Sequence, residues 1–205
     1  MNKKEVKSFQ KFRNNYNFKY QEIIKKEDSL YFNNELIEDS EKKYFVGNTF
    51  INIGYNSKEH LSRMLSNLYP IEFKFKGKKV RSIEGVLQGI KYKDKKIQNL
   101  ILRYAGVDAY HTRGANTLDM WTQNQTLYWQ GKEMKRNSEE YQFFLDELYL
   151  SAIKNPIYKR AILSTGNKYL LHHIGNTDIA QTVLTRFEYE QRLNCLREYI
   201  KTNQK

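Results

Sequence analysis

Three polar side chains in the short segment 82–92 are the first candidates for chemistry. Glu84, Gln88 and Lys91 stand at positions i, i+4 and i+7, so on a helix they share one face. A carboxylate in such a stripe can stabilise positive charge, and a lysine on the same face can keep it ionised or bind a phosphate. The same spacing also fits a solvated face with an ordinary glutamate–lysine pair.

The remaining residues of this segment favour a helix with one apolar side. Ile83, Val86, Leu87 and Ile90 fall on a common face, which predicts a helix from Ser82 to Tyr92. Two glycines, Gly85 and Gly89, are four residues apart beside the polar stripe. Each costs about 1 kcal/mol of helix stability relative to alanine, but each lets a ligand or another backbone approach closely. We expect this helix to form the wall of a ligand site.

Two segments are typical of strands. Residues 43–53 are dominated by β-branched and aromatic side chains, which predicts a strand or hairpin. Residues 71–76 alternate apolar and charged side chains and end at Gly77, the pattern of a half-buried strand followed by a turn.

Two longer helices have clear start signals. The first begins at Ser138, carries acidic residues in its first turn, and should end before Pro156. The second begins at Thr185, which with Glu188 forms a capping box. With the short strands, these helices predict an α+β fold that is mainly helical, with a small sheet or hairpins.

Length and composition indicate one domain in a reducing compartment. The 205 residues suit a single core, and the lone Cys195 excludes an internal disulfide framework; we expect this thiol to be buried. Residues 1–42 are the most polar part and are interpreted as an extension packed on or beside a domain of residues 43–205. The N-terminus has no apolar run long enough for a signal peptide or membrane helix, so we expect a cytoplasmic protein.

The net charge of +12 should attract polyanions, including nucleic acids and pyrophosphate-bearing ligands. A Lys-, Asn- and Tyr-rich composition is also what an AT-rich genome produces. Metal catalysis is not expected, because His172 and His173 are adjacent, and His60 and His111 have no neighbouring ligand motif. No glycine-rich phosphate loop is present, so we expect no cofactor, and NAD would be at most a relative of the substrate.

Several motifs together resemble the NADAR superfamily of N-glycosidases, named for its link to NAD and ADP-ribose. Residues 65–70 (LSNLYP) are similar to the Ser-Asn-aromatic-Tyr-Pro segment of the family, and residues 82–92 are similar to its Glu-x-x-x-Gln-x-x-Lys-aromatic helix. Further segments resemble the longer members: residues 127–132, the helix after Ser138, and residues 163–166, 172–178 and 182–185. The likeness covers about residues 45–200. It implies a NADAR-like fold.

The resemblance also implies roles for individual side chains. Glu84 would stabilise the cation-like sugar or assist a water, and Asp178 matches a second family carboxylate, although Asp in this position also suits a turn or cap. Gln88 would hold ribose hydroxyls or orient Glu84. The expected substrate-binding residues are Asn67, Tyr69, Gln88, Lys91, Trp121, Trp129 and Gly131.

The chain departs from the family at two points. Gly85 stands where many members carry a histidine after the helix glutamate, which leaves the pocket roomier. The essential family tryptophan matches either Trp121, which is favoured, or Trp129 in an apparent hairpin insertion. Either ring could instead be a core aromatic.

Three functions fit the resemblance. The first is removal of ADP-ribose from a nucleobase, guanine in DNA above all, as for NADAR proteins paired with DNA-modifying toxins in toxin–antitoxin or phage-defence systems. The second is cleavage of ribosylamine intermediates of the riboflavin pathway. The third is a non-catalytic module that binds ADP-ribose or NAD derivatives. The expected partner is therefore ADP-ribosylated nucleic acid or a small ADP-ribose-containing molecule.

Overall fold

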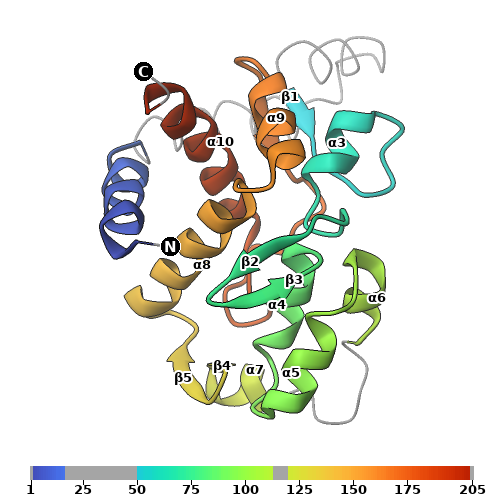
Figure 1. Cartoon of the computed structure of the whole chain (residues 1–205), viewed down its shortest axis with the longest axis vertical. Helices are drawn as coiled ribbons and strands as arrows, with labels where there is room; N and C mark the ends of the chain where they lie inside the picture. The colour runs from blue at the N-terminus through green and yellow to red at the C-terminus, as the bar shows by residue number, and fades with distance from the viewer. Residues whose placement is uncertain (1, 17–49, 113–119, 204–205) are drawn as a thin grey trace.

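Helices α8 (Glu139–Ala152) and α10 (Arg186–Thr202) begin where their start signals predict. In the computed structural model, which describes residues 2–16, 50–112 and 120–203, the hydroxyl of Ser138 accepts a hydrogen bond from the N–H of Tyr141. Thr185 and Glu188 form the expected capping box. Both helices bury much of their surface in the core, so they form the rigid frame of the fold (Figure 1).

Helix α4 (Ile83–Gly89) lies between several other elements, and all seven of its residues are buried. It contacts α5 (Lys95–Ile101), α6 (Gly106–His111), α8 and strand β3 (Lys78–Val80). The helix is shorter than the predicted 82–92, because Ser82 is its N-cap and Ile90 its C-cap. Residues 91 and 92 therefore leave the helix in a turn.

The strands of the described ranges pair two by two. Strand β1 (Phe50–Asn52) runs parallel to β6 (Tyr169–Leu171), with Phe50 opposite Tyr169. Strand β2 (Phe73–Phe75) and β3 form one antiparallel hairpin, and β4 (Thr126–Trp129) and β5 (Lys132–Lys135) form another. The predicted strand at 71–76 and the turn at Gly77, where φ is +80°, are confirmed. Of the predicted 43–53 strand, residues 43–49 lie outside the described ranges.

Three shorter helices complete the part of the chain that follows β1: α3 (His60–Leu65), α7 (Met120–Asn124) and α9 (Pro156–Ser164). Pro156 is the first residue of α9, so it separates this helix from α8 as expected. The mainly helical α+β class predicted from the sequence is confirmed.

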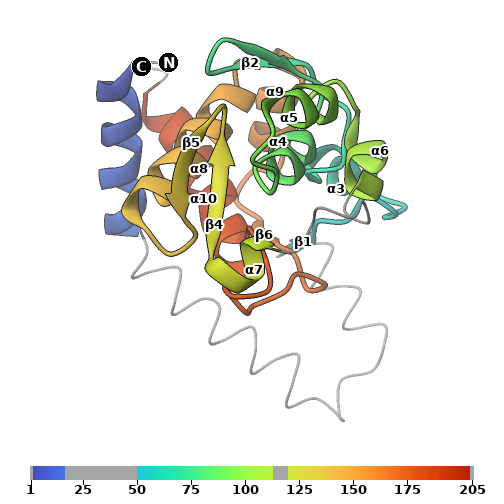
Figure 2. The same cartoon turned by 90° about the horizontal axis from the view of Figure 1, so that it is seen from below.

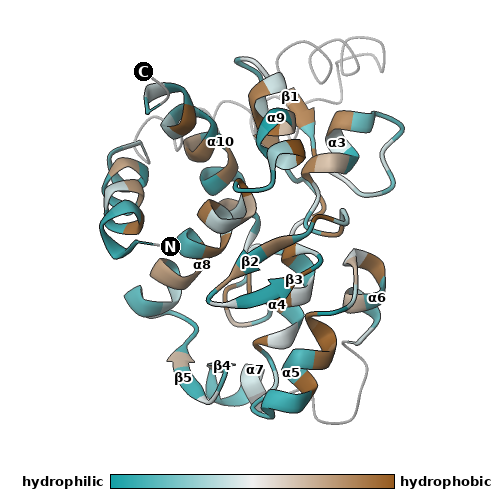
Figure 3. Ribbon diagram, viewed as in Figure 1, coloured by the Kyte–Doolittle hydropathy of each residue, from teal (hydrophilic) through white to brown (hydrophobic). Residues whose placement is uncertain are grey.

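Residues 3–16 form an N-terminal helix that lies beside α10 (Figures 1 and 2). Its Val6 and Phe9 are buried in the core, and the Phe9 ring meets Tyr199 edge to face at 5.3 Å between centroids. The Arg13 guanidinium pairs with the fully buried carboxylate of Asp146 at 3.0 Å. Apolar and polar residues alternate around this helix, α8 and α10 in Figure 3, as amphipathic packing requires.

Candidate active site

The two glycines of α4 face a neighbouring backbone. A Cβ on Gly85 would lie 3.4 Å from the carbonyl oxygen of Ile101, and one on Gly89 would lie 3.9 Å from that of Gln98. Both contacts are with α5 or its cap, so the glycines allow α5 to pack closely on α4. Of the two approaches that the sequence left open, a ligand or another backbone, the structure shows the backbone.

The polar stripe of α4 lines a cavity of about 940 Å³. Glu84, Leu87, Gln88 and Lys91 form one wall of it. The other described lining residues come from the segments 52–57, 66–68, 172–176 and 181–185, with Glu59, Tyr110 and Tyr189. Sites for nucleotide-sized ligands commonly have volumes of about 300–1,000 Å³. The cavity is therefore large enough for such a ligand.

A hydrogen-bonded chain connects the three polar residues of α4. Lys91 Nζ donates to Gln88 Oε1 at 2.8 Å, and Gln88 Nε2 donates to Glu84 Oε1 at 2.6 Å. Glu84 and Gln88 are only 8% and 4% exposed, so they meet the cavity rather than bulk solvent. Lys91 also lies 6.0 Å from the centroid of the Trp121 ring. The alternative of a solvated glutamate–lysine face is therefore wrong for Glu84 and Gln88.

The segment opposite Glu84 is positioned by buried tyrosines. Tyr149 donates from its hydroxyl to Asn67 Oδ1 at 2.9 Å, which leaves the amide hydrogens of Asn67 as donors beside the cavity. The Asn67 carbonyl in turn accepts from the N–H of Glu84 at 3.0 Å. Burial raises the pKa values of Tyr149 and Tyr189, and the nearby charge of Glu84 contributes to both increases. Both phenols are therefore neutral donors.

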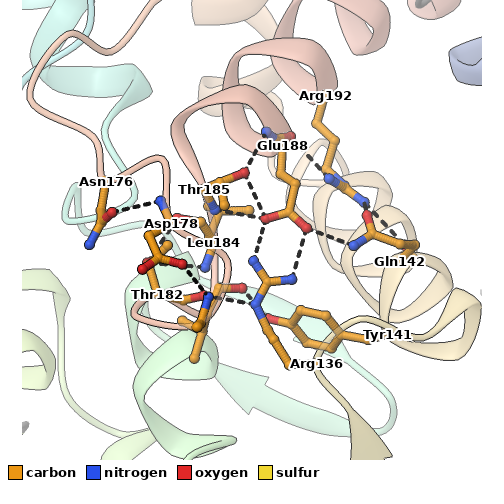
Figure 4. A network of polar contacts seen from close by, with 12 residues as sticks. Arg136, Tyr141, Gln142, Asn176, Asp178, Thr182, Leu184, Thr185, Glu188 and Arg192 are labelled. Atoms are coloured by element: carbon orange, nitrogen blue, oxygen red, sulfur yellow. Dashed lines mark hydrogen bonds and ion pairs between the residues drawn. The ribbon is translucent and has the colours of Figure 1, made fainter. Parts of the chain in front are cut away.

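The wall formed by residues 182–185 is supported from behind by Arg136 (Figure 4). The guanidinium of Arg136, which is fully buried, donates to the Thr182 carbonyl at 2.7 Å and binds both carboxylate oxygens of Glu188 at 2.9 and 2.5 Å. Tyr141 donates to the Val183 carbonyl at 2.5 Å. Burial alone would raise the pKa of Glu188, but hydrogen bonds and charge from Arg136 hold it at about 2. Glu188 is therefore ionised at neutral pH.

The cavity also contains a histidine that the sequence analysis assigned no function. His172 lies directly after β6, and its ring Nδ1 is 2.8 Å from the carbonyl oxygen of Ile53. The parallel pairing of β1 with β6 brings these two residues together. No local sequence signal reports this pairing, because the strands are far apart along the chain.

The structure brings four of the predicted site residues together. Glu84, Gln88, Lys91 and Asn67 line the cavity, and Trp121, which is 4% exposed, lies next to Lys91.

The other four predicted site residues are not among the described residues that line the cavity: Tyr69, Trp129, Gly131 and Asp178. Trp129 packs in the core, 5.0 Å from the Phe75 ring, and Tyr69 packs beside the core. Gly131 occupies the turn between β4 and β5 with φ of +89°. Asp178 is exposed in a turn, where its Oδ1 accepts from the N–H of Ala180 at 2.8 Å.

Other reactive groups of the described ranges lie apart from this cavity. Cys195 is buried as expected, and burial raises the pKa of its thiol to about 12. Among the described residues, no group of three or more His, Cys, Asp or Glu side chains has the arrangement of a metal site. In the same ranges, no helix combines the length and apolarity needed to span a bilayer.

The fold and the cavity define a NADAR-type protein. The solution structure of the Escherichia coli protein YbiA is similar, with a TM-score of 0.51 and 18% identity over 75% of this chain and 86% of that one. The profile of the family described as "Bacteriophage protein GP30.3" matches residues 59–198. The chain belongs to this NADAR-type family. No curated protein sequence matches it significantly.

Proposed function

We propose that this protein is an N-glycosidase that hydrolyses the bond between a ribose C1 and a nitrogen, and that its substrate is ADP-ribose attached to guanine in DNA. The observation that carries the proposal is the carboxylate of Glu84, which is 8% exposed and lines the cavity of about 940 Å³. Membership of a NADAR-type family supports the reaction class.

The reaction needs an anionic oxygen near the sugar. As the C1–N bond breaks, positive charge develops on C1 and the ring oxygen, and a carboxylate on that side stabilises it. Glu84 also accepts a proton from the attacking water, so that the C1–O bond forms while the nitrogen leaves with a proton. Because Gln88 donates to Oε1 of Glu84, the carboxylate has a fixed orientation before substrate binds.

Lys91 and the carboxamides of the cavity account for substrate binding. Lys91 places a cation at the end of the hydrogen-bonded chain, where it keeps Glu84 ionised or contacts a phosphate. Donors of Asn67 reach ribose hydroxyls or the base. The Trp121 ring, adjacent to Lys91, offers a surface for stacking.

Basic residues on the surface favour a nucleic acid as the carrier of the ADP-ribose. The N-terminal helix exposes Lys3, Lys7 and Lys11, which repeat every four residues and so share one side. Its one acidic residue, Glu5, pairs with Lys154 at 3.1 Å. Together with the net charge of +12, this lysine stripe supports attraction to phosphates.

The test is to incubate the full-length protein separately with DNA ADP-ribosylated on guanine, NAD, free ADP-ribose and ribosylaminouracil phosphate. Chromatography then measures the released sugar. We expect ADP-ribose to be released from the DNA, with guanine restored. Release from the ribosylaminouracil alone would replace the substrate by a riboflavin intermediate. Binding of ADP-ribose without any release would indicate a non-catalytic module and overturn the proposal.

A further inference from the structure

The imidazole of His172 is fixed in one orientation at the edge of the cavity. Its Nδ1 lies 2.8 Å from the Ile53 carbonyl oxygen, and a carbonyl can only accept, so Nδ1 carries a hydrogen. The ring meets Tyr189 edge to face, with centroids 5.2 Å apart and planes at 84°. A Cβ on Gly175 would lie 2.9 Å from Cδ2 of His172, so the glycine leaves room for the ring.

The second ring nitrogen, Nε2, is available to a ligand. His172 lines the cavity, and within residues 2–16, 50–112 and 120–203 no group hydrogen-bonds to Nε2. Because Nδ1 is already a donor, Nε2 accepts a hydrogen bond when the ring is neutral and donates one when it is protonated. Glu84 lies in the wall of the same cavity. The cavity therefore holds a carboxylate and an imidazole.

We propose that His172 is the proton donor to the leaving nitrogen of the N-glycosidic bond, an inference that rests on the proposed function. In the step, the C1–N bond breaks, its electron pair moves to the base, and the imidazolium Nε2–H transfers its proton to the base. Water forms the new C1–O bond and gives a proton to Glu84. The two side chains then return to their starting states by proton exchange with solvent.

The surroundings of His172 suit a group that titrates near neutral pH. Helix α10 supplies Glu190, whose Oε1 accepts from the His172 backbone N–H at 2.5 Å and from Arg186 Nε at 2.7 Å. The Glu190 charge is thereby compensated by a cation. Tyr189 faces the ring as a neutral phenol, because burial raises its pKa. The acidic groups of the described cavity lining are Glu59 and Glu84.

The experiment compares the full-length protein with His172→Asn, because the asparagine amide can still donate to the Ile53 carbonyl but has no equivalent of Nε2. Two substrates are used: DNA ADP-ribosylated on guanine, and ADP-ribose carrying 4-nitrophenol on C1, whose nitrophenolate leaves without a proton. We expect His172→Asn to lower kcat about 100-fold on the DNA, within the range for general acids, and less than about 3-fold on the nitrophenyl compound. Glu84→Gln should lower both.

The pH profile gives a second readout. For the wild-type protein, kcat/KM on the DNA should fall as the pH rises through the titration of His172, and this alkaline limb should be absent in His172→Asn. His172→Gln serves as a second variant if Asn lowers the melting temperature. The control is His60→Asn, an exposed histidine at the start of α3, which should behave as wild type.

The outcomes separate this inference from the proposed function. Equal losses on both substrates, an unchanged alkaline limb, or full activity of His172→Asn on the DNA would overturn the role of His172 alone. A wild-type protein that cleaves neither substrate would overturn the proposed function and this inference with it.

Discussion

Gln88 donates a hydrogen bond from Nε2 to Oε1 of Glu84 over 2.6 Å, while its own Oε1 accepts from Lys91 over 2.8 Å. The two bonds determine which end of the amide faces the carboxylate. The amide therefore transmits the influence of a cation to Glu84. A glutamine in this place has a function that neither an acid nor an apolar residue can replace.

Gln88→Glu should raise the pKa of one of the two adjacent carboxylates, because like charges in a buried site disfavour double ionisation. We expect kcat/KM at pH 7 to fall at least about tenfold and the acid limb of its pH profile to move to higher pH. Gln88→Leu is the matched variant, since it removes the amide without adding charge. An acid limb at the same pH in Gln88→Glu and wild type would contradict the coupling of these two residues.

Tyr149→Phe removes the hydrogen bond that orients Asn67. We expect unfolding free energy to fall by about 1 kcal/mol. The KM should rise several-fold, because the Asn67 amide is then free to rotate. Tyr158→Phe is the control, because the buried Tyr158 hydroxyl has no hydrogen-bond partner in the described structure. Similar KM values for the two variants would show that the orientation of Asn67 is unimportant.

The predictability of the fold followed the range of the signals. Helix α10 has its start written into Thr185 and Glu188, and the turn of the β2–β3 hairpin lies at Gly77, so both could be predicted locally. Residues 3–16 were expected only as a polar extension, because most of their side chains are polar. Their helix is held by contacts with distant residues such as Tyr199.

The candidate site was predictable on α4 and less so elsewhere. The i, i+4, i+7 spacing indicated the stripe that meets the cavity, since a helix converts that spacing into one face. The neighbourhood of His172 depends on the pairing of β1 with β6, which single-sequence periodicity does not encode. Trp121 and Trp129 looked equivalent as aromatic residues, and only tertiary packing distinguishes the ring near Lys91 from the ring near Phe75.

Glu188→Gln should destabilise the protein by about 3 kcal/mol at pH 7, because it leaves the buried Arg136 without its ion partner. The folded-state pKa of about 2 lies below the ordinary 4.5, so the stabilisation is complete above about pH 4.5 and is lost as the pH falls toward 2. Urea unfolding at pH 7 and pH 3 measures this difference. The destabilisation should be smaller at pH 3.

The control for Glu188 is Glu72→Gln. Its carboxylate is exposed and pairs with Lys79 at 2.8 Å on the surface, so we expect little change at either pH. A destabilisation in Glu188→Gln that did not depend on pH would show that the ion pair with Arg136 is not its cause.

Replacing Lys3, Lys7 and Lys11 by Gln should weaken binding to ADP-ribosylated duplex DNA and reduce the salt dependence of binding by up to about 0.9 per lost phosphate contact. Hydrolysis of an ADP-ribosylated guanosine mononucleotide should be unchanged. The matched control replaces three other exposed lysines, Lys93, Lys95 and Lys96, and removes the same charge. Equal weakening by both sets would assign the effect to net charge rather than to the N-terminal helix.

The most direct measurement is single-turnover release of ADP-ribose from guanine-modified DNA by wild type and Glu84→Gln, with unfolding curves recorded for both. We expect release by Glu84→Gln to be slower by at least about 100-fold while its unfolding free energy stays within about 1 kcal/mol of wild type, as for a residue that acts on the substrate rather than holding the core. Release by Glu84→Gln at the wild-type rate would contradict the assignment of this carboxylate to the reaction.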